Sequence, residues 1–304
     1  MIIKAFDDTH LNKIENDMMT IFLLGGNSIR GAFLNGSRMI NQMKANHETG
    51  IMESLILGHA YLAAGLLISD MKGKERISIK LDTLGPIRGL LVESNSLGEV
   101  RGYLKNSQLE ISPEIKSLDT APYIGQGFLL FSRHIAEESS PFTGQVVLQY
   151  STIAKDLAYY FLTSEQRPSA FNLSVFFGPD GIINGAGGLF LQVLPDADIK
   201  MLDELSETLE NMASIGSMLA ESKSSKEIIT KCLGKFSPEI LAHRPVVFHC
   251  GCSKERFGSF IAAMDKSDVE EILEKGPFPL ETQCHNCNSN YAFSRDEIAL
   301  LTGK

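Results

Sequence analysis

Positive charge is the first thing that this 304-residue chain is short of. It carries 28 Lys and Arg against 37 Asp and Glu, which gives a formal net charge of −9. Binding to the phosphate backbone of a nucleic acid depends on clustered basic side chains. The composition therefore argues against a nucleic acid as a partner.

The sequence also lacks the segments that take a protein into or across a membrane. Residues Met1–Asp8 are acidic where a signal peptide is basic, and they hold no apolar run ending in small residues. The longest nearly uncharged apolar stretch, residues 55–69, falls short of the roughly 20 residues that cross a bilayer. We therefore expect a cytoplasmic protein with no membrane partner, in which this stretch is a buried helix.

Cysteine is scarce and unevenly distributed. There are five cysteines, and four of them lie between positions 250 and 287. A secreted domain held by disulfides has more cysteines and spreads them along the chain. The pattern indicates a reducing compartment and a local use for the four clustered thiols.

What the sequence does contain predicts an α+β fold, in which an N-terminal antiparallel sheet packs with helices. Short apolar runs between residues 76 and 150 are separated by Gly, Asn, Ser and Pro, which is typical of strands joined by hairpins. A short entry strand and a loop precede them. The other predicted elements of this core domain, residues 1–195, are helices over 37–47, 51–71 and 153–164 and strands over 171–177 and 188–194.

Residues 196–247 predict a helical connector. Ser224 with Glu227 is a capping-box pair that starts a short helix, and Gly234 ends it. Before this pair, apolar residues three or four apart form one stripe on a long helix: Leu202, Leu205, Leu209, Met212, Ile215 and Leu219. Such a stripe must lie on another apolar surface.

The remaining segment, residues 248–304, is too short for an apolar core alone to hold it folded. Three short helices are predicted in it. Their signals are an apolar face formed by Phe257, Phe260, Ile261 and Met264, and the capping pairs Ser267 with Glu270 and Ser294 with Glu297. Something besides apolar packing must stabilise this tail.

Two close cysteine pairs supply a candidate. Cys250-Gly-Cys252 and Cys284-His-Asn-Cys287 are separated by 31 residues. Each pair offers two thiolates from one local turn, which is what a tetrahedral Zn²⁺ site requires. Binding of a structural zinc ion contributes about 10 to 16 kcal/mol in small domains, more than a core of this size supplies. We predict one zinc ion bound by the four cysteines.

The residues alone leave alternatives open. The zinc site can be permanently structural, or it can be linked to redox state, because reduced thiols that bind a metal can also be oxidised pairwise to disulfides. A thioredoxin-like dithiol is disfavoured, since Cys284 and Cys287 do not follow a strand of a βαβ unit. His249 or His285 could replace a thiolate, and Cys232 is expected to pack within the connector.

Several segments resemble the heat shock protein 33 family, the redox-regulated 33 kDa chaperonins. The resemblance spans most of the chain, although residues 1–50 carry no matching motif. The tail resembles the family's zinc module in the order and spacing of its motifs, and two upstream segments resemble the end of the family's core. The segments are Phe248–Arg256, Cys284–Cys287 and Tyr291–Phe293 in the tail, and Tyr160–Gln166 with Pro168 and Gly187–Pro195 upstream.

The resemblance implies an ATP-independent holdase rather than an enzyme, inactive while reduced and zinc-bound and switched on by oxidants. It implies that Cys250 pairs with Cys252, and Cys284 with Cys287, as zinc leaves. The connector of such a chaperone then loses its fold and exposes apolar surface to unfolding client proteins, often in a homodimer. The alternative is a protein-binding module that zinc stabilises without redox regulation.

Overall fold

The structure is a computed structural model that describes residues 11–12, 14–110, 117–135, 138, 140–195 and 197–303. The acidic N-terminal residues 1–8 and residue 196, where the predicted connector starts, lie outside the described residues. The described residues form two compact units that meet in the sequence between His249 and Cys250.

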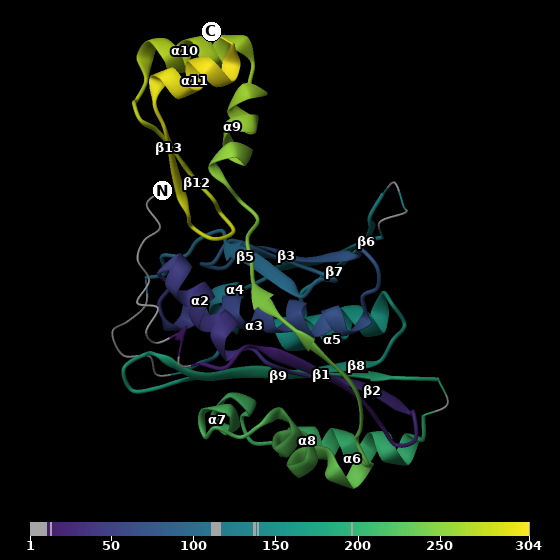
Figure 1. The fold of residues 1–304 in the computed structure, drawn as a ribbon. Helices are drawn as coiled ribbons and strands as arrows, with labels where there is room; N and C mark the ends of the chain where they lie inside the picture. Colours follow the sequence, from purple (N-terminus) through teal and green to yellow (C-terminus); the bar gives the residue numbers. More distant parts are fainter. Residues whose placement is uncertain are drawn as a thin grey trace. The chain divides into compact units, whose positions relative to one another are not determined.

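A helical layer forms the centre of the larger unit. It consists of α2 (Ser37–His47), α3 (Ile51–Leu67) with its 3-10 extension η1 (Ile68–Asp70), and α5 (Ile153–Thr163), which lie between two sheets (Figure 1). These helices confirm the predictions for residues 37–47, 51–71 and 153–164. Fifteen of the 17 residues of α3 are buried, as expected for a helix that is apolar on most faces.

The helix Ile51–Asp70 is longer than the apolar run from which its length was estimated. It has 20 residues, and an 18-residue window within it has a mean hydropathy of 1.7, so by length and composition it could cross a membrane. However, 89% of this 18-residue stretch is buried inside the protein. The prediction that this stretch is a buried helix is confirmed.

One sheet has five antiparallel strands in the order β10-β1-β2-β9-β8. Its first hairpin replaces the single short entry strand that the sequence predicted. Both hairpin strands are buried on both faces, so they lack the alternation that marks a strand in a sequence. The strands are β1 (Met18–Leu24), β2 (Ile29–Asn35), β8 (Ser169–Phe177), β9 (Ile183–Val193) and β10 (Glu239–Pro245).

The other sheet has six strands in the order β11-β5-β4-β3-β6-β7. Its first five strands along the chain confirm the antiparallel sheet predicted within residues 76–150, and β11 joins β5 in parallel. The short helix α4 (Ala121–Ile124) precedes β6. The strands are β3 (Arg76–Thr83), β4 (Gly89–Asn95), β5 (Glu99–Leu104), β6 (Gly127–His134), β7 (Phe142–Val147) and β11 (Val247–Phe248).

The connector covers the face of the five-stranded sheet that points away from the central helices (Figure 1). Its helices are α6 (Ile199–Glu210), α7 (Ile215–Ala220) and α8 (Ser225–Leu233), followed by the 3-10 turn η2 (Gly234–Phe236). The predicted apolar stripe does face this sheet. It lies on two helices rather than one, because the chain turns after Glu210 and Ser214 caps α7.

The second half of the connector holds one confirmation and one correction. The Ser224–Glu227 capping box is present at the start of α8. Residues 239–245 are not helical as predicted but form β10, which pairs with β1 from Pro245 opposite Met18 to Glu239 opposite Leu23. The backbone hydrogen bonds of this edge position outweigh any local helical preference.

The smaller unit is the tail. Its core cluster has three buried apolar residues, Ile261, Phe293 and Ile298, and Val269 is buried outside this cluster. Three helices confirm the prediction, and a two-stranded hairpin adds to it. The elements are α9 (Lys254–Ala262), α10 (Lys266–Lys275), β12 (Leu280–Gln283), β13 (Asn290–Phe293) and α11 (Arg295–Thr302).

Two details of the tail differ from the prediction. Phe260 is 58% exposed and Met264, which lies beyond the end of α9, is 39% exposed, so neither joins the buried face of this helix, whereas Ile261 does. The N-cap residue of α10 is Asp265, so the pair Ser267 and Glu270 lies inside the helix. The third signal is correct: Ser294 and Glu297 form the capping box of α11.

Candidate metal centre

The four clustered cysteines come from two segments of the tail. Cys250 and Cys252 precede α9, whose N-cap is Ser253. Cys284 and Cys287 lie in the loop between β12 and β13. The N-terminus of α9 carries partial positive charge beside the first pair, which favours thiolates over thiols there.

The loop of the β12–β13 hairpin is tightly closed. The backbone N–H of Asn288 donates to the carbonyl oxygen of Cys284 at 2.7 Å, and the N–H of Cys284 donates to Ser289 at 2.9 Å. Asn288 has a φ of 60°, a left-handed conformation that asparagine adopts more readily than most residues. This turn brings Cys284 and Cys287 to the same place.

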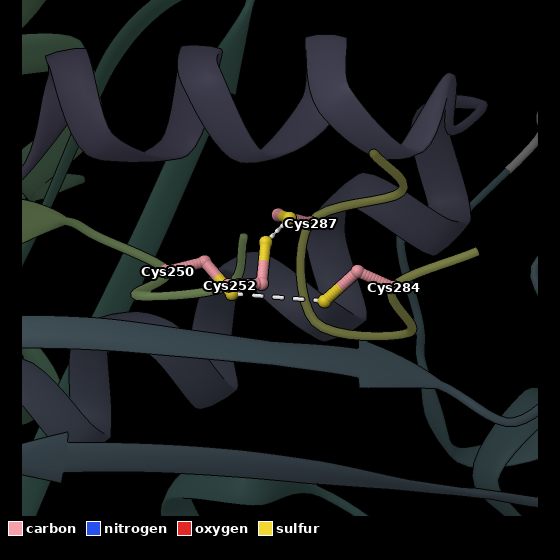
Figure 2. Close-up of side chains that lie close together, drawn as sticks. All are labelled: Cys250, Cys252, Cys284 and Cys287. Atoms are coloured by element: carbon pink, nitrogen blue, oxygen red, sulfur yellow. Dashed lines mark hydrogen bonds between the residues drawn. The ribbon is translucent and has the colours of Figure 1, made fainter. Parts of the chain in front are cut away.

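The four sulfur atoms lie within 4.8 Å of one another and could hold a metal ion. Cys250 Sγ is 3.7 Å from Cys284 Sγ, and Cys252 Sγ is 3.3 Å from Cys287 Sγ (Figure 2). Four sulfurs around a tetrahedral zinc ion, each with a Zn–S bond of about 2.3 Å, are about 3.8 Å apart. The donor set and its spacing therefore fit Zn²⁺.

The electrostatics of the site point the same way. Hydrogen bonds from Cys250 and Cys284 hold the pKa of Cys287 far below its usual range. Conversely, hydrogen bonding to Cys284 and Cys287, together with burial, raises the pKa of Cys250. Cys250 alone would lower the pKa of Cys284, but Cys287 and burial outweigh it and raise that pKa to about 11. One thiolate thus raises the pKa of the neighbouring thiols. All four thiols can ionise together only beside a cation.

Two side chains beside the cysteines were not predicted as neighbours of the site. The hydroxyl of Tyr291 lies 3.1 Å from Cys252 Sγ, and Ser289 Oγ lies 3.3 Å from Cys287 Sγ. The ring of Tyr291 packs on Phe257 with centroids 5.1 Å apart, which connects the cysteine site to the apolar core of the tail. Burial and the contact with Cys252 raise the pKa of Tyr291, so it remains a hydrogen-bond donor. Tyr291 begins the segment Tyr291–Phe293 that resembles the family, but nothing in the sequence indicated that Ser289 lies beside the site.

The two histidines considered as substitute ligands are not members of the group. Among the described residues, the group that could hold a metal contains the four cysteines and neither His249 nor His285. His249 Nε2 is instead 3.7 Å from the carboxylate of Glu99, within the larger unit. Cys232 is half-buried in α8 and packs against the connector's apolar cluster, which confirms its predicted role.

The chain is similar to known proteins over most of its length. A family model described as Hsp33 protein matches residues 17–294. The 33 kDa chaperonin of Geobacillus sp. (strain WCH70) is 32% identical over 263 residues, which cover 86% of this chain and 89% of the relative. The 33 kDa chaperonin of Lachnoclostridium phytofermentans is 32% identical over 285 residues, covering 93% and 97%.

A solved structure extends the similarity to three dimensions. The crystal structure of the 33 kDa chaperonin (heat shock protein 33 homolog) from Thermotoga maritima has a TM-score of 0.86 and 28% sequence identity. The match covers 95% of this chain and 98% of that one. Sequence and fold therefore agree, and the chain belongs to the Hsp33 family of chaperonins.

Proposed function

We propose that this protein is a redox-regulated, ATP-independent holdase that binds unfolding proteins under oxidative stress. The observation that carries the proposal is the four-thiol site in a unit whose core cluster has only three buried apolar residues. Membership of a chaperonin family supports the chaperone part. The redox part is supported by the thiol geometry and by the resemblance of the motifs.

In the resting state, we propose, Cys250, Cys252, Cys284 and Cys287 bind one Zn²⁺ as thiolates. A bound zinc ion supplies about 10 to 16 kcal/mol of apparent binding free energy in comparable small domains. The tail needs such a contribution, because a unit of this size buries too little apolar surface to fold securely alone. The thiolates are also the form that oxidants attack.

Oxidation would consume the ligands in pairs. Two thiolates give up two electrons to one molecule of hydrogen peroxide, which takes up two protons and leaves as two molecules of water, while an S–S bond forms. We propose the pairs Cys250–Cys252 and Cys284–Cys287, with release of the metal. The shortest sulfur contacts link the two segments instead, so pairing within each segment must be tested directly.

The proposed consequence reaches the connector through the chain itself. Only His249 separates Cys250 from the strand β11; the backbone N–H of His249 donates to Val100 at 3.0 Å, and that of Val247 donates to Gly98 at 2.8 Å. Loss of order in the tail would weaken this edge pairing and the adjoining β10. Because residues 196–247 are one continuous segment, we propose that they then leave the sheet.

Departure of the connector would uncover a large apolar surface. In the described structure, Phe22, Leu24 and Phe33 of the five-stranded sheet are at most 2% exposed beneath the connector helices. Exposed patches of this kind bind other apolar surfaces. We propose that unfolding clients bind there, in the cytoplasm and without a nucleic acid or a membrane, and that the active form is a homodimer.

The division of labour follows from this scheme. Residues 1–195 would be the chaperone core, residues 196–247 the releasable connector and residues 248–304 the redox-sensitive tail. No catalytic step is needed. The alternative is a protein-binding module with a permanent zinc site, in which mild oxidation would leave both the metal and partner binding unchanged.

A thermal aggregation assay tests the proposal. Peroxide-treated protein is expected to suppress aggregation of an unfolding client in a stoichiometric manner without ATP, and reduced, zinc-loaded protein is not. Cys232→Ser is the control, because this cysteine lies outside the thiol group and its loss should leave the switch intact. Equal activity of both redox forms would refute the regulation.

A further inference from the structure

Three arginines converge on Asp70 at the end of η1. Arg30 of β2 forms an ion pair with Asp70 and also donates to the carbonyl oxygen of Ser69. Arg167 Nη1 lies 3.5 Å from Asp70 Oδ2, and Arg133 Nη2 lies 3.9 Å from the same oxygen. One carboxylate thus faces three guanidinium groups.

Of the three arginines, only Arg30 has close hydrogen-bond acceptors for its guanidinium group. Arg30 bonds the carboxylate and a carbonyl group at a helix C-terminus, where the partial charge is negative. Arg133 is only 19% exposed, yet within the described part of the chain its side chain has no hydrogen-bond acceptor. Arg167 has one contact, at the outer limit for a hydrogen bond. Around Asp70, the guanidinium N–H donors therefore outnumber the oxygen atoms that accept from them.

A further unused donor lies beside Arg30. Gln192 of β9 is the register partner of Arg30 on the neighbouring strand, so their side chains lie side by side on one face of the sheet. Gln192 is 6% exposed, and its Nε2 has no hydrogen-bond partner among the residues that the structure describes. A buried donor without an acceptor costs about 1 to 3 kcal/mol, so an acceptor is expected there.

Two of these arginines occupy inward-facing positions, one on each sheet. Arg133 pairs with the buried Ile77 on β3, which places it on the inner face of the six-stranded sheet. Arg30 and Ala32 are two residues apart on β2, so their side chains point to the same face. Ala32 belongs to the core between the sheets. Among the described residues, Glu165 is a second acid of this region and accepts a hydrogen bond from Tyr160 at 3.3 Å. Counted over these described groups, the three arginines against Asp70 and Glu165 leave a formal excess of one positive charge.

We propose that Arg133, Arg167 and the amide of Gln192 bind a phosphate group, while Arg30 and Asp70 hold the arrangement in place. The fork of a guanidinium group matches the oxygens of a phosphate, and several phosphate oxygens can accept from donors that approach from different directions. The planar carboxylate of Asp70 contacts Arg167 only at 3.5 Å and Arg133 only at 3.9 Å, at or beyond the outer limit for a hydrogen bond. Bound phosphate would link the two sheets at this end of the helical layer.

The test measures binding of phosphate to the full-length, reduced, zinc-loaded protein. Inorganic phosphate and glycerol 3-phosphate are titrated calorimetrically at constant ionic strength, and the Tm is followed in parallel. Saturable binding and a rise in Tm are expected for at least one probe. Arg133→Gln and Arg167→Gln should each weaken binding tenfold or more. Arg76→Gln, which removes an exposed arginine of β3 that has no ion pair with Asp70, should not.

The outcomes separate the possible ligands. Preference for the ester identifies a phosphorylated metabolite, and equal binding identifies free phosphate. The proposal is wrong if neither probe saturates, if citrate binds as well as phosphate does, or if Arg133→Gln and Arg167→Gln bind like Arg76→Gln. Should Arg133→Gln fail to fold, Arg167→Gln, at a 47% exposed position, and Gln192→Met still decide the question.

Discussion

The backbones of Gly185 in β9 and Gly216 in α7 touch. A Cβ atom on Gly216 would lie 2.8 Å from the carbonyl oxygen of Gly185, and a Cβ on Gly185 would lie 2.2 Å from that of Gly216. Ser174 Oγ supports the approach, since it accepts from the Gly216 N–H at 3.0 Å and lies 2.8 Å from Ser214 Oγ. The connector thus sits on the sheet through a contact that only glycines permit.

Gly216→Ala should loosen the connector in the reduced protein. The added methyl group meets backbone atoms that cannot move aside, and overpacking of this kind costs about 1 to 3 kcal/mol. That cost shifts the equilibrium between docked and undocked connector roughly five- to hundredfold. We expect stronger binding of an apolar fluorescent dye and partial suppression of client aggregation without any oxidant.

Gly234→Ala is the matched control for this change. It lies in the same connector, and a Cβ there would meet nothing within 4 Å. Its dye binding and client protection should equal those of the wild type. If Gly216→Ala behaves in the same way as Gly234→Ala, the connector does not mask the client-binding surface.

Ile298→Ala should lower both the folding stability of the tail and its affinity for zinc. Ile298 is fully buried and is one of the three buried apolar residues of the tail's core cluster. Truncation of a buried isoleucine costs about 2 to 5 kcal/mol, and metal binding is coupled to folding. Competition with a chromogenic zinc chelator should show at least a tenfold lower zinc affinity.

Leu300→Ala is the control, because Leu300 is on the same helix but 84% exposed, and its zinc affinity should match that of the wild type. Identical affinities for all three proteins would show that metal binding does not depend on the tail's core.

Asp17 should make the larger unit less stable as pH rises. It accepts from the N–H groups of Arg38 and Met39 at 2.9 and 2.5 Å, at the start of α2. Burial raises its pKa to about 7, against about 3.9 in an unfolded chain. Between these values the folded state binds more protons than the unfolded state, so the stabilisation present below pH 4 is lost as pH rises to 7.

The measurement is urea unfolding of wild type and Asp17→Asn at several pH values from 4 to 8. Relative to the variant, the wild type should lose stability by up to about 4 kcal/mol across this window. Burial lowers the pKa of His59 to about 4, which gives an opposite slope in both proteins and cancels in the difference. Parallel stability curves would show that Asp17 does not titrate in this range.

The elements that were predicted well are those whose local signals and tertiary roles agree. Helix α3 is apolar on most faces and is buried on most faces, and the two Ser–Glu capping boxes begin helices where expected. The signal at Ser267 failed because Asp265, two residues earlier, is also a good N-cap. Strand β10 was missed because its partner, β1, lies more than 200 residues away in the sequence.

The cysteine site was predictable to the level of its ligands. Two short spacings place four thiols in two local turns, and the structure gathers them within 4.8 Å. Contacts of Ser289 and Tyr291 with the sulfurs depend on how the β12–β13 hairpin closes, which no spacing reveals. The arginine group around Asp70 was invisible for the same reason, because its members come from residues 30, 70, 133 and 167.

Metal and thiol content decide the central claim most directly. Reduced protein should contain one zinc ion per chain, and brief peroxide treatment at raised temperature should release it with the loss of four free thiols. Peptide mapping without reduction should then find Cys250 joined to Cys252 and Cys284 to Cys287, in samples that protect a client. Reduced protein that holds no metal yet keeps an ordered tail, or oxidised protein that keeps its zinc while it protects a client, would contradict the account.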